Sequence, residues 1–187
     1  MNKTSLMKNK KGLVMGVANE RSIAWAIAKE LFNAGAEIAL TYQGDALKKR
    51  VYPLAKQINS PIIIECNGEK ENDVTKTFKK IKNKWGNIDF VLHAIAFSNK
   101  EELKGKYIDT SKENFKKTLN VSCFSFTSVA KEASKIMTKG GSLLTLTYFG
   151  SERVMPHYNV MGIAKAALET SIKYLAKDLG LKNISVN

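Results

Sequence analysis

The fold is decided by residues 12–33, GLVMGVANERSIAWAIAKELFN. The first part, residues 12–17, is a short apolar run that predicts a buried strand. Residues 22–33 predict a helix because apolar side chains recur on one face, at Ile23, Ala26, Ile27 and Leu31. The residues between the two elements therefore form a strand-to-helix turn.

The same alternation continues to the end of the chain. Further strands are expected at residues 37–42, 61–65, 89–95, 142–147 and 182–187. Further helices are expected at residues 45–58 (interrupted near Pro53), 72–85, 111–137 and 157–179. The pattern predicts an α/β fold, a doubly wound and mostly parallel sheet of the Rossmann type with helices on both faces. Such sheets bind ligands at the carboxyl ends of their strands.

Length and composition fit one globular domain. The chain has 187 residues, of which 44% are hydrophobic and 25% charged, and this excludes a disordered protein. We expect residues 1–187 to form a single dinucleotide-binding domain that ends at the start of the sixth strand. No apolar run reaches the roughly 18 residues of a membrane span or resembles a signal peptide, so we expect a cytoplasmic protein with no membrane partner. Cys66 and Cys123 are distant from each other, and we expect packed free thiols and no metal site.

The charge of the chain is strongly basic. Thirty Lys and Arg against 17 Asp and Glu give a net charge of +13. Arg21, Arg50 and Arg153 are the only arginines, and because nucleic-acid readers rely on arginine, nucleic acid is not an expected partner. A solvated Lys-rich surface is the first explanation of the charge, and an acidic protein partner is the second.

The first strand-to-helix turn, residues 16–22, lies where a pyrophosphate meets the positive end of a helix. Gly16 is its only glycine, and the Ser22 hydroxyl would either reach a phosphate or cap the helix. After the second strand, Gln43 replaces the acidic residue that usually binds the ribose 2′-hydroxyl. Gln43 can bind a ribose or adenine edge, while the cations at residues 48–50 offer an alternative contact to a 2′-phosphate.

The strongest local pattern is the pair Tyr158 and Lys165, which are seven residues and hence two helical turns apart. A nearby cation favours the phenolate and would lower the tyrosine pKa from its ordinary value of about 10. Such a pair can donate a hydrogen bond or a proton to a carbonyl oxygen that becomes an enolate. By spacing alone, an amphipathic helix with a buried tyrosine and a snorkelling lysine is the better explanation.

Five segments, in order along the chain, resemble the bacterial NADH-dependent enoyl-acyl-carrier-protein reductases of the short-chain dehydrogenase/reductase superfamily. They are GVANERSIAW (16–25), TYQG (41–44), HAIAFS (93–98), SFT (125–127) and residues 145–169. The Tyr-x6-Lys spacing, in place of the superfamily's common Tyr-x3-Lys, makes the resemblance specific, and the match runs from about residue 12 to residue 187. It implies hydride transfer from NADH, with NADPH less favoured, to C3 of a trans-2-enoyl thioester in type II fatty-acid synthesis. Acyl carrier protein is the implied partner.

The resemblance also implies roles for individual residues. Tyr158 would hydrogen-bond the thioester carbonyl, Lys165 would bind the nicotinamide ribose, and Tyr148 is the second active-site tyrosine. Asn67 stands where the family usually has aspartate against the adenine. The cofactor-binding positions would be Gly16, Ser22, Ile23, Gln43, Asn67, Gly68 and Ile95, and Ser98 would contact the acyl substrate.

The family continues beyond Asn187 with a further cofactor contact, a substrate lid, the last strand and much of a homotetramer interface. Without these C-terminal strands and the lid, an open sheet edge is expected. Two alternatives remain: another short-chain reductase that acts on a carbonyl, and a non-catalytic nucleotide-binding fragment.

Overall fold

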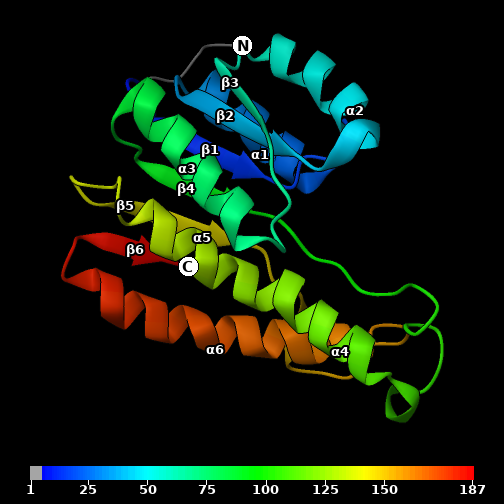
Figure 1. The fold of residues 1–187 in the computed structure, drawn as a ribbon. Coiled ribbons are helices and arrows are strands. Elements are labelled where there is room, and N and C mark those ends of the chain that lie inside the picture. The colour runs from blue at the N-terminus through cyan, green and yellow to red at the C-terminus, as the bar shows by residue number, and fades with distance from the viewer. Residues whose placement is uncertain (1–5) are drawn as a thin grey trace.

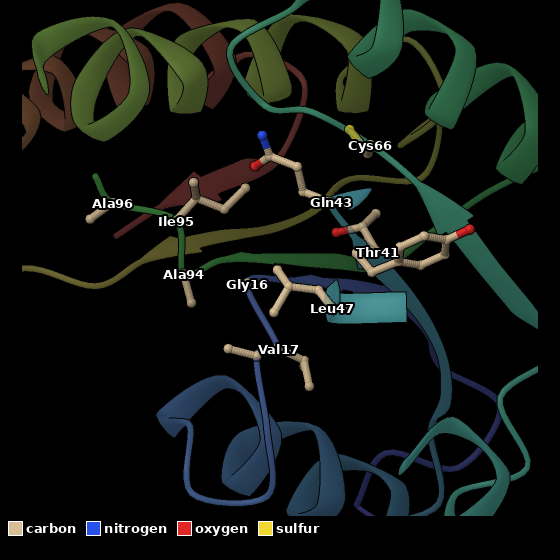
Figure 2. A pocket seen from close by; sticks show the side chains of 11 residues that line it. Gly16, Val17, Thr41, Gln43, Leu47, Cys66, Ala94, Ile95 and Ala96 are labelled. Carbon is tan, nitrogen blue, oxygen red and sulfur yellow. The ribbon is translucent and has the colours of Figure 1, made fainter. Parts of the chain in front are cut away.

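The computed structural model describes residues 6–187 as a six-stranded sheet flanked by helices (Figure 1). The strands are β1 (Lys11–Met15), β2 (Glu37–Tyr42), β3 (Ile62–Glu65), β4 (Phe90–His93), β5 (Gly141–Thr145) and β6 (Ile184–Val186). Every pairing is parallel, in the order β3-β2-β1-β4-β5-β6. The predicted doubly wound sheet is therefore confirmed. Its strand order reverses between β1 and β4, where ligands bind in such folds, and the loops at this point line a cavity (Figure 2).

Helices cover both faces of the sheet. They are α1 (Ile23–Asn33), α2 (Gly44–Gln57), α3 (Glu71–Trp85), α4 (Lys112–Leu119), α5 (Ser125–Ala133) and α6 (Val160–Gly180), with short helical turns η1 (Tyr107–Asp109), η2 (Asn120–Phe124) and η3 (Phe149–Ser151). One core lies between the sheet and α3, α5 and α6, which lie side by side in Figure 1, and the other lies under α1 and α2. Leu13 faces the first core and Val14 the second, and because both are fully buried, β1 reads as a continuous apolar run.

Two expected helices differ from the structure. The helix expected at residues 111–137 is divided into α4 and α5 by a π-type turn, η2. The expected break at Pro53 is wrong, because α2 continues through it. Pro53 and Lys49, whose carbonyl loses its helical partner, are both exposed, so water can satisfy the freed group.

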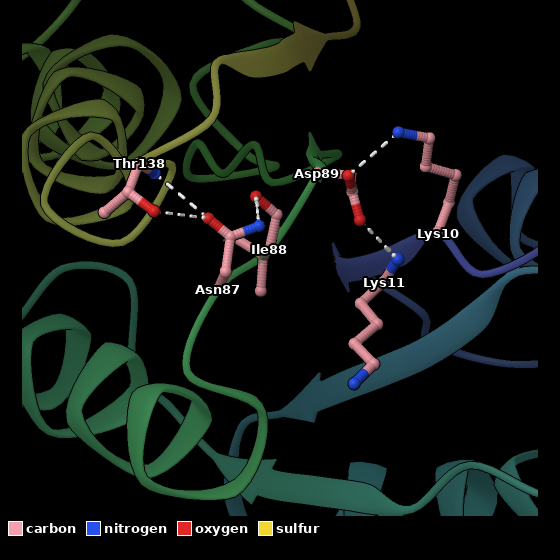
Figure 3. Close-up of polar contacts among 6 residues, drawn as sticks. All are labelled: Lys10, Lys11, Asn87, Ile88, Asp89 and Thr138. Atoms are coloured by element: carbon pink, nitrogen blue, oxygen red, sulfur yellow. Dashed lines mark hydrogen bonds and ion pairs between the residues drawn. The ribbon is translucent and has the colours of Figure 1, made fainter.

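Polar side chains join the strands at the amino end of the sheet (Figure 3). The Asp89 carboxylate accepts from the Lys11 backbone N–H at 2.8 Å and from the Lys10 ammonium at 3.1 Å. The Asn87 side-chain oxygen accepts from the Thr138 N–H and hydroxyl at 3.0 and 3.1 Å. These contacts attach β4 to β1 and to the loop before β5, at the end of the sheet opposite the cavity.

The last strand lies at an edge of the sheet. Among the described residues, β6 pairs with β5 alone, so its other side is an open edge of the sheet, as expected. Leu144 of β5 is 41% exposed on the face that α1 and α2 cover elsewhere. Among residues 6–187, none of the helices has the length and hydropathy that a membrane span needs.

Candidate active site

The cavity at the carboxyl ends of β1, β2 and β4 has a volume of about 190 Å³. A neighbouring cavity of about 170 Å³ shares three lining residues with it, so the two form one groove. The shared residues are Gln43, Ile95 and Ala96. Figure 2 shows the side chains of Gln43 and Ile95 beside each other in this groove. Gly16, Gln43 and Ile95 lie together in the first part of the groove, while Asn67 and Gly68 line the second part.

Gly16 allows the turn after β1 to pass close to the end of β4. Its φ is +99°, and a Cβ at this position would lie 2.0 Å from the Ala94 carbonyl oxygen. No other residue type combines this backbone conformation with so close an approach. The single glycine of the turn is therefore required by the geometry of the groove.

Ser22 precedes α1 but does not cap it. Its hydroxyl donates to the Asn19 carbonyl at 2.7 Å and accepts from the Ala18 N–H at 3.4 Å, and it makes no bond to the helix amides. The alternative of a side-chain cap at Ser22 is therefore wrong. The first amides of α1 remain available to an anion at the positive end of the helix dipole. Ile23, at the start of the helix, is 66% exposed.

Asn67, which the resemblance predicts to contact adenine, lies in a local turn. Its side-chain oxygen accepts from the Glu69 N–H at 3.0 Å, and an amide oxygen has a second lone pair. A Cβ on Gly68 would lie 3.2 Å from Cδ1 of Ile95, so the glycine leaves room between the two loops.

Tyr158 and Lys165 do not lie on one helix, as was expected: Lys165 lies on α6, whereas Tyr158 comes before it. Tyr158 precedes the helix, in a turn where His157 and Asn159 both have positive φ, 59° and 38°. Lys165 is 6% exposed and donates to the Leu146 carbonyl at 2.7 Å. Burial lowers the pKa of Lys165, and the nearby Cys123 and Glu169 oppose that shift.

The expected lowering of the Tyr158 pKa by Lys165 is wrong in this structure. Burial, followed by the neighbouring Tyr148, raises the pKa of Tyr158. The two tyrosine rings are in edge-to-face contact, with centroids 4.9 Å apart and planes at 65°. Tyr158 is therefore a neutral phenol at neutral pH, a hydrogen-bond donor rather than a base.

An apolar cavity of about 310 Å³ lies beside Tyr158. Its lining comes from η1, η3, the loop after η3 and the first turns of α6, and includes Tyr107, Val154, Met155 and Ile163. Glycines make the packing possible here: a Cβ on Gly150 would lie 2.5 Å from the Tyr158 ring. Ser98 does not line this cavity.

Ser98 lies in another cavity, beside α4, which shares Phe97 and Lys117 with the second part of the groove. Its hydroxyl accepts from the Thr118 hydroxyl at 2.9 Å and from the Asn114 amide at 3.2 Å. The structure therefore places Ser98 on the loop after β4 but apart from Tyr158.

Sequence reasoning missed His93, the last residue of β4. The side chain is fully buried, with Nε2 2.8 Å from the Ser125 hydroxyl and Nδ1 3.2 Å from the Thr145 hydroxyl. Burial, and then the positive charge of Lys165, lowers the pKa of His93 to about 3. His93 is therefore neutral and holds β4, β5 and α5 together below the groove. A histidine inside an apolar strand was the available signal. Within the described part of the chain, no group of side chains is placed to hold a metal ion.

Comparisons with known proteins agree with this geometry. A family model described as enoyl-(acyl carrier protein) reductase matches residues 16–187. The curated enoyl-acyl-carrier-protein reductase (NADH) 1 of Rhizobium meliloti strain 1021 is 58% identical over 184 residues, which are 98% of this chain and 68% of the relative. The corresponding NADH reductase of Rickettsia conorii is 52% identical, over 98% of this chain and 71% of its own length.

Solved structures show the same relationship. The enoyl-acyl-carrier-protein reductase of Anaplasma phagocytophilum, in complex with NAD, superposes with a TM-score of 0.96 at 52% identity and covers 98% of this chain and 71% of that chain. The Bacillus cereus reductase, with NADP+ and an indole naphthyridinone, gives a TM-score of 0.95 at 49% identity, over 97% of this chain and 72% of that chain. In sequence and in fold, this chain belongs to the enoyl-acyl-carrier-protein reductase family.

Proposed function

We propose that residues 1–187 are a single dinucleotide-binding domain that acts as an NADH-dependent enoyl-acyl-carrier-protein reductase. The observation that carries the proposal is a half-buried, neutral Tyr158 that lines an apolar cavity at the carboxyl edge of a Rossmann sheet. The reaction reduces the double bond of a trans-2-enoyl thioester, with hydride added at C3 and a proton at C2. This is the reducing step of type II fatty-acid elongation.

The groove fits a dinucleotide. The Gly16 turn and the start of α1, which has no side-chain cap, offer backbone amides to a pyrophosphate. Ser22 directly precedes that helix and Ile23 is its first residue. Gln43 and Asn67 present amide groups to the adenosine half. When bound, the cofactor supplies the hydride, and the protein supplies its position and electrostatics.

Lys165 is suited to hold the ribose of the nicotinamide half. An ammonium has three donors, and the Leu146 carbonyl takes one of them. Lys165 lines neither part of the groove, and we propose that its remaining two N–H groups donate to ribose hydroxyls of a bound cofactor. Gly68 and Ile95 pack beside the same groove and complete its wall.

Tyr158 is suited to polarise the thioester carbonyl. Because burial and Tyr148 raise its pKa, the phenol keeps its proton at neutral pH and can donate to the carbonyl oxygen. This hydrogen bond strengthens as negative charge develops on the enolate oxygen. Tyr148, 46% exposed, packs against the Tyr158 ring and helps to orient it.

The apolar cavity is suited to the acyl chain, and Ser98 to the part of the thioester outside that cavity. We propose acyl carrier protein as the partner that delivers the substrate, since a net charge of +13 fits an acidic carrier. For the complete protein we propose a cytoplasmic homotetramer. The exposed Phe124 of η2 is a candidate interface residue.

The test is NADH oxidation by the chain with a trans-2-enoyl thioester, alongside Tyr158→Phe. The variant should lose at least about 100-fold in turnover, the usual effect of deleting one transition-state donor, and should keep NADH binding. Tyr174→Phe, an exposed tyrosine on α6, is the matched control and should be unaffected. Full turnover in Tyr158→Phe would overturn the residue assignment. Preference for a 3-ketoacyl thioester would favour a carbonyl reductase, and nucleotide binding without turnover a non-catalytic fragment.

A further inference from the structure

The backbone around Tyr158 is unusual, because the residues on both sides of it have positive φ. The φ angles of His157 and Asn159 are 59° and 38°. Positive φ is unfavourable for residues with a side chain, and Asn159, with a ψ of −121°, also lies outside the left-handed α region that asparagine tolerates. Such conformations persist where surrounding contacts hold them, and they are frequent at functional sites.

The side-chain amide of Asn159 provides such contacts. Its Nδ2 donates to the carbonyl oxygens of Gly105 at 2.8 Å, Glu102 at 3.0 Å and Leu103 at 3.3 Å. An amide nitrogen carries two protons, so the three carbonyls share them. These acceptors lie 54 to 57 residues earlier, in the loop between β4 and η1. One side chain thus ties this loop to the residue that follows Tyr158.

The far side of the loop is also held. The Glu102 carboxylate accepts from the N–H and the hydroxyl of Ser111, both at 2.9 Å. Ser111 caps α4 by accepting from the Asn114 N–H at 3.1 Å. Asn114 in turn donates to Ser98, where the loop leaves β4. The loop from residue 98 to residue 111, called here the β4–α4 loop, is therefore fixed to α4 on one side and to Asn159 on the other.

The β4–α4 loop also supplies a wall of the cavity beside Tyr158. Tyr107, in this loop, lines the same cavity as Tyr158. The distance between loop and turn thus sets the space available to a bound molecule. Because Asn159 bridges the two, a change in that one amide would alter both the width of the cavity and the direction of the Tyr158 hydroxyl.

We propose that Asn159 is a positioning residue that locks the β4–α4 loop onto the turn carrying Tyr158. The proposal rests on the proposed enoyl reduction for its kinetic consequence but not for its structural one. Asn159 itself lines the cavity, but because its amide donates to the loop carbonyls, it acts through Tyr158 and Tyr107 rather than on the reacting atoms. Its backbone, with positive φ, aims the amide at the loop, and its three bonds there keep the turn in that conformation.

Asn159→Gly separates the two contributions, because glycine accepts positive φ without strain but lacks the amide. Hydrogen exchange of the whole chain should show amides of the β4–α4 loop exchanging at least 10-fold faster in this variant. The rest of the sheet should keep its protection. The matched control is Asn183→Gly, since Asn183 has a φ of 56° at the other end of α6. The control should leave the β4–α4 loop unchanged.

Kinetics give the second readout. In Asn159→Gly, kcat for the enoyl thioester should fall about 10-fold and the KM for the thioester should rise, while the KM for NADH stays constant. Asn159→Asp keeps the shape but turns a carboxylate toward three carbonyls, so it should not rescue activity. Unchanged loop exchange in Asn159→Gly would overturn the proposal. Faster exchange with unchanged kcat and thioester KM would overturn the positioning role. If the wild-type chain reduces no enoyl thioester, the proposed function fails, while hydrogen exchange still decides whether Asn159 locks the loop.

Discussion

The polar groups at the two ends of the parallel sheet differ in how many of their hydrogen bonds are made within the chain. At the amino end, Asp89 accepts from Lys10 and Lys11, and Asn87 accepts from Thr138, so these side chains find their partners within the chain (Figure 3). At the carboxyl end, the first amides of α1 have no side-chain cap, and Lys165 uses one of its donors on a carbonyl. The amino end thus stabilises the fold, while the carboxyl end keeps hydrogen-bonding capacity for a ligand.

Turns with positive φ occur at both ends of the sheet, since Gly140 and Asn183 at the amino end have φ angles of 79° and 56°. At the carboxyl end, Gly16, His157 and Asn159 have positive φ, and the groove depends on a contact that only glycine permits. The amino-end contacts of Asp89 and Lys11 are ordinary hydrogen bonds between a carboxylate and a strand. Because the groove and Tyr158 lie at the carboxyl end, changes there should affect binding and catalysis most, whereas changes at the amino end should affect stability alone.

Gly16→Ala should have the largest effect of any single change, on both stability and NADH binding. The new Cβ meets the Ala94 carbonyl at 2.0 Å in a backbone with φ +99°, so strain and overlap combine. We expect a loss of at least about 3 kcal/mol in unfolding free energy, measured by urea titration, and loss of NADH binding. Gly44→Ala is the control, because Gly44 has φ +71° with nothing within 4 Å of the added Cβ. It should cost about 1 kcal/mol, and equal losses in the two variants would refute the close-contact argument.

Lys165→Met tests the ammonium alone, since methionine retains most of the buried stem. We expect kcat/KM for the enoyl thioester to fall about 100-fold, with weaker NADH binding, because a positioned donor is lost. Lys177→Met makes the same change at an exposed position of α6 and should alter kcat/KM less than about twofold. Activity retained in Lys165→Met would mean that the lysine is structural.

Most of the fold could be predicted from the sequence, because buried parallel strands and helical periodicity are local patterns. The strand at Glu37–Tyr42 has the predicted bounds, and Gly16 marks the groove. The turn at η2 could not be predicted, because its side chains bind a loop distant in the sequence. There the Ser122 hydroxyl donates to the Phe97 carbonyl at 3.1 Å.

The chemistry of the site was less predictable than its location. The spacing of Tyr158 and Lys165 suggested a cation that lowers the tyrosine pKa, but Lys165 turns to the Leu146 carbonyl, and burial raises that pKa. The contacts of Asn159 with Gly105 join segments 54 residues apart, and no local pattern encodes them. Burial and long-range partners decide the behaviour of these side chains, and both depend on tertiary structure.

His93, the last residue of β4, should make the unfolding free energy depend on pH. Its pKa in the folded chain is lowered to about 3 by burial and by Lys165, against an ordinary value of 6.5. Between these values the unfolded chain binds a proton that the folded chain does not, so stability falls as pH falls below 6.5. We expect a loss of roughly 2 kcal/mol from pH 7.5 to pH 5, measured by urea unfolding.

Replacement of His93 by glutamine should abolish most of this pH dependence, because the new side chain does not titrate. His157→Gln, at the other, exposed histidine of the chain, should leave it unchanged. Glu102 and Glu169 do not account for this pH dependence. Hydrogen bonds lower the pKa of both carboxyl groups below 4.5, so the stability that they contribute is lost only at lower pH. The same slope in His93→Gln as in the wild type would contradict a buried neutral histidine.

The smallest effect is expected at the amino end. Asp89→Ala removes the acceptor of the Lys11 N–H and should lower the unfolding free energy by about 1 to 2 kcal/mol, because a partly buried donor loses its partner. Lys10→Ala removes only an exposed ion pair with the same carboxylate and should cost less than about 1 kcal/mol. Urea unfolding measures both, and fluorescence titration should show unchanged NADH affinity. If Asp89→Ala instead weakened NADH binding more than it lowered stability, the two ends of the sheet would be coupled, and the division between a stabilising end and a ligand-binding end would fail.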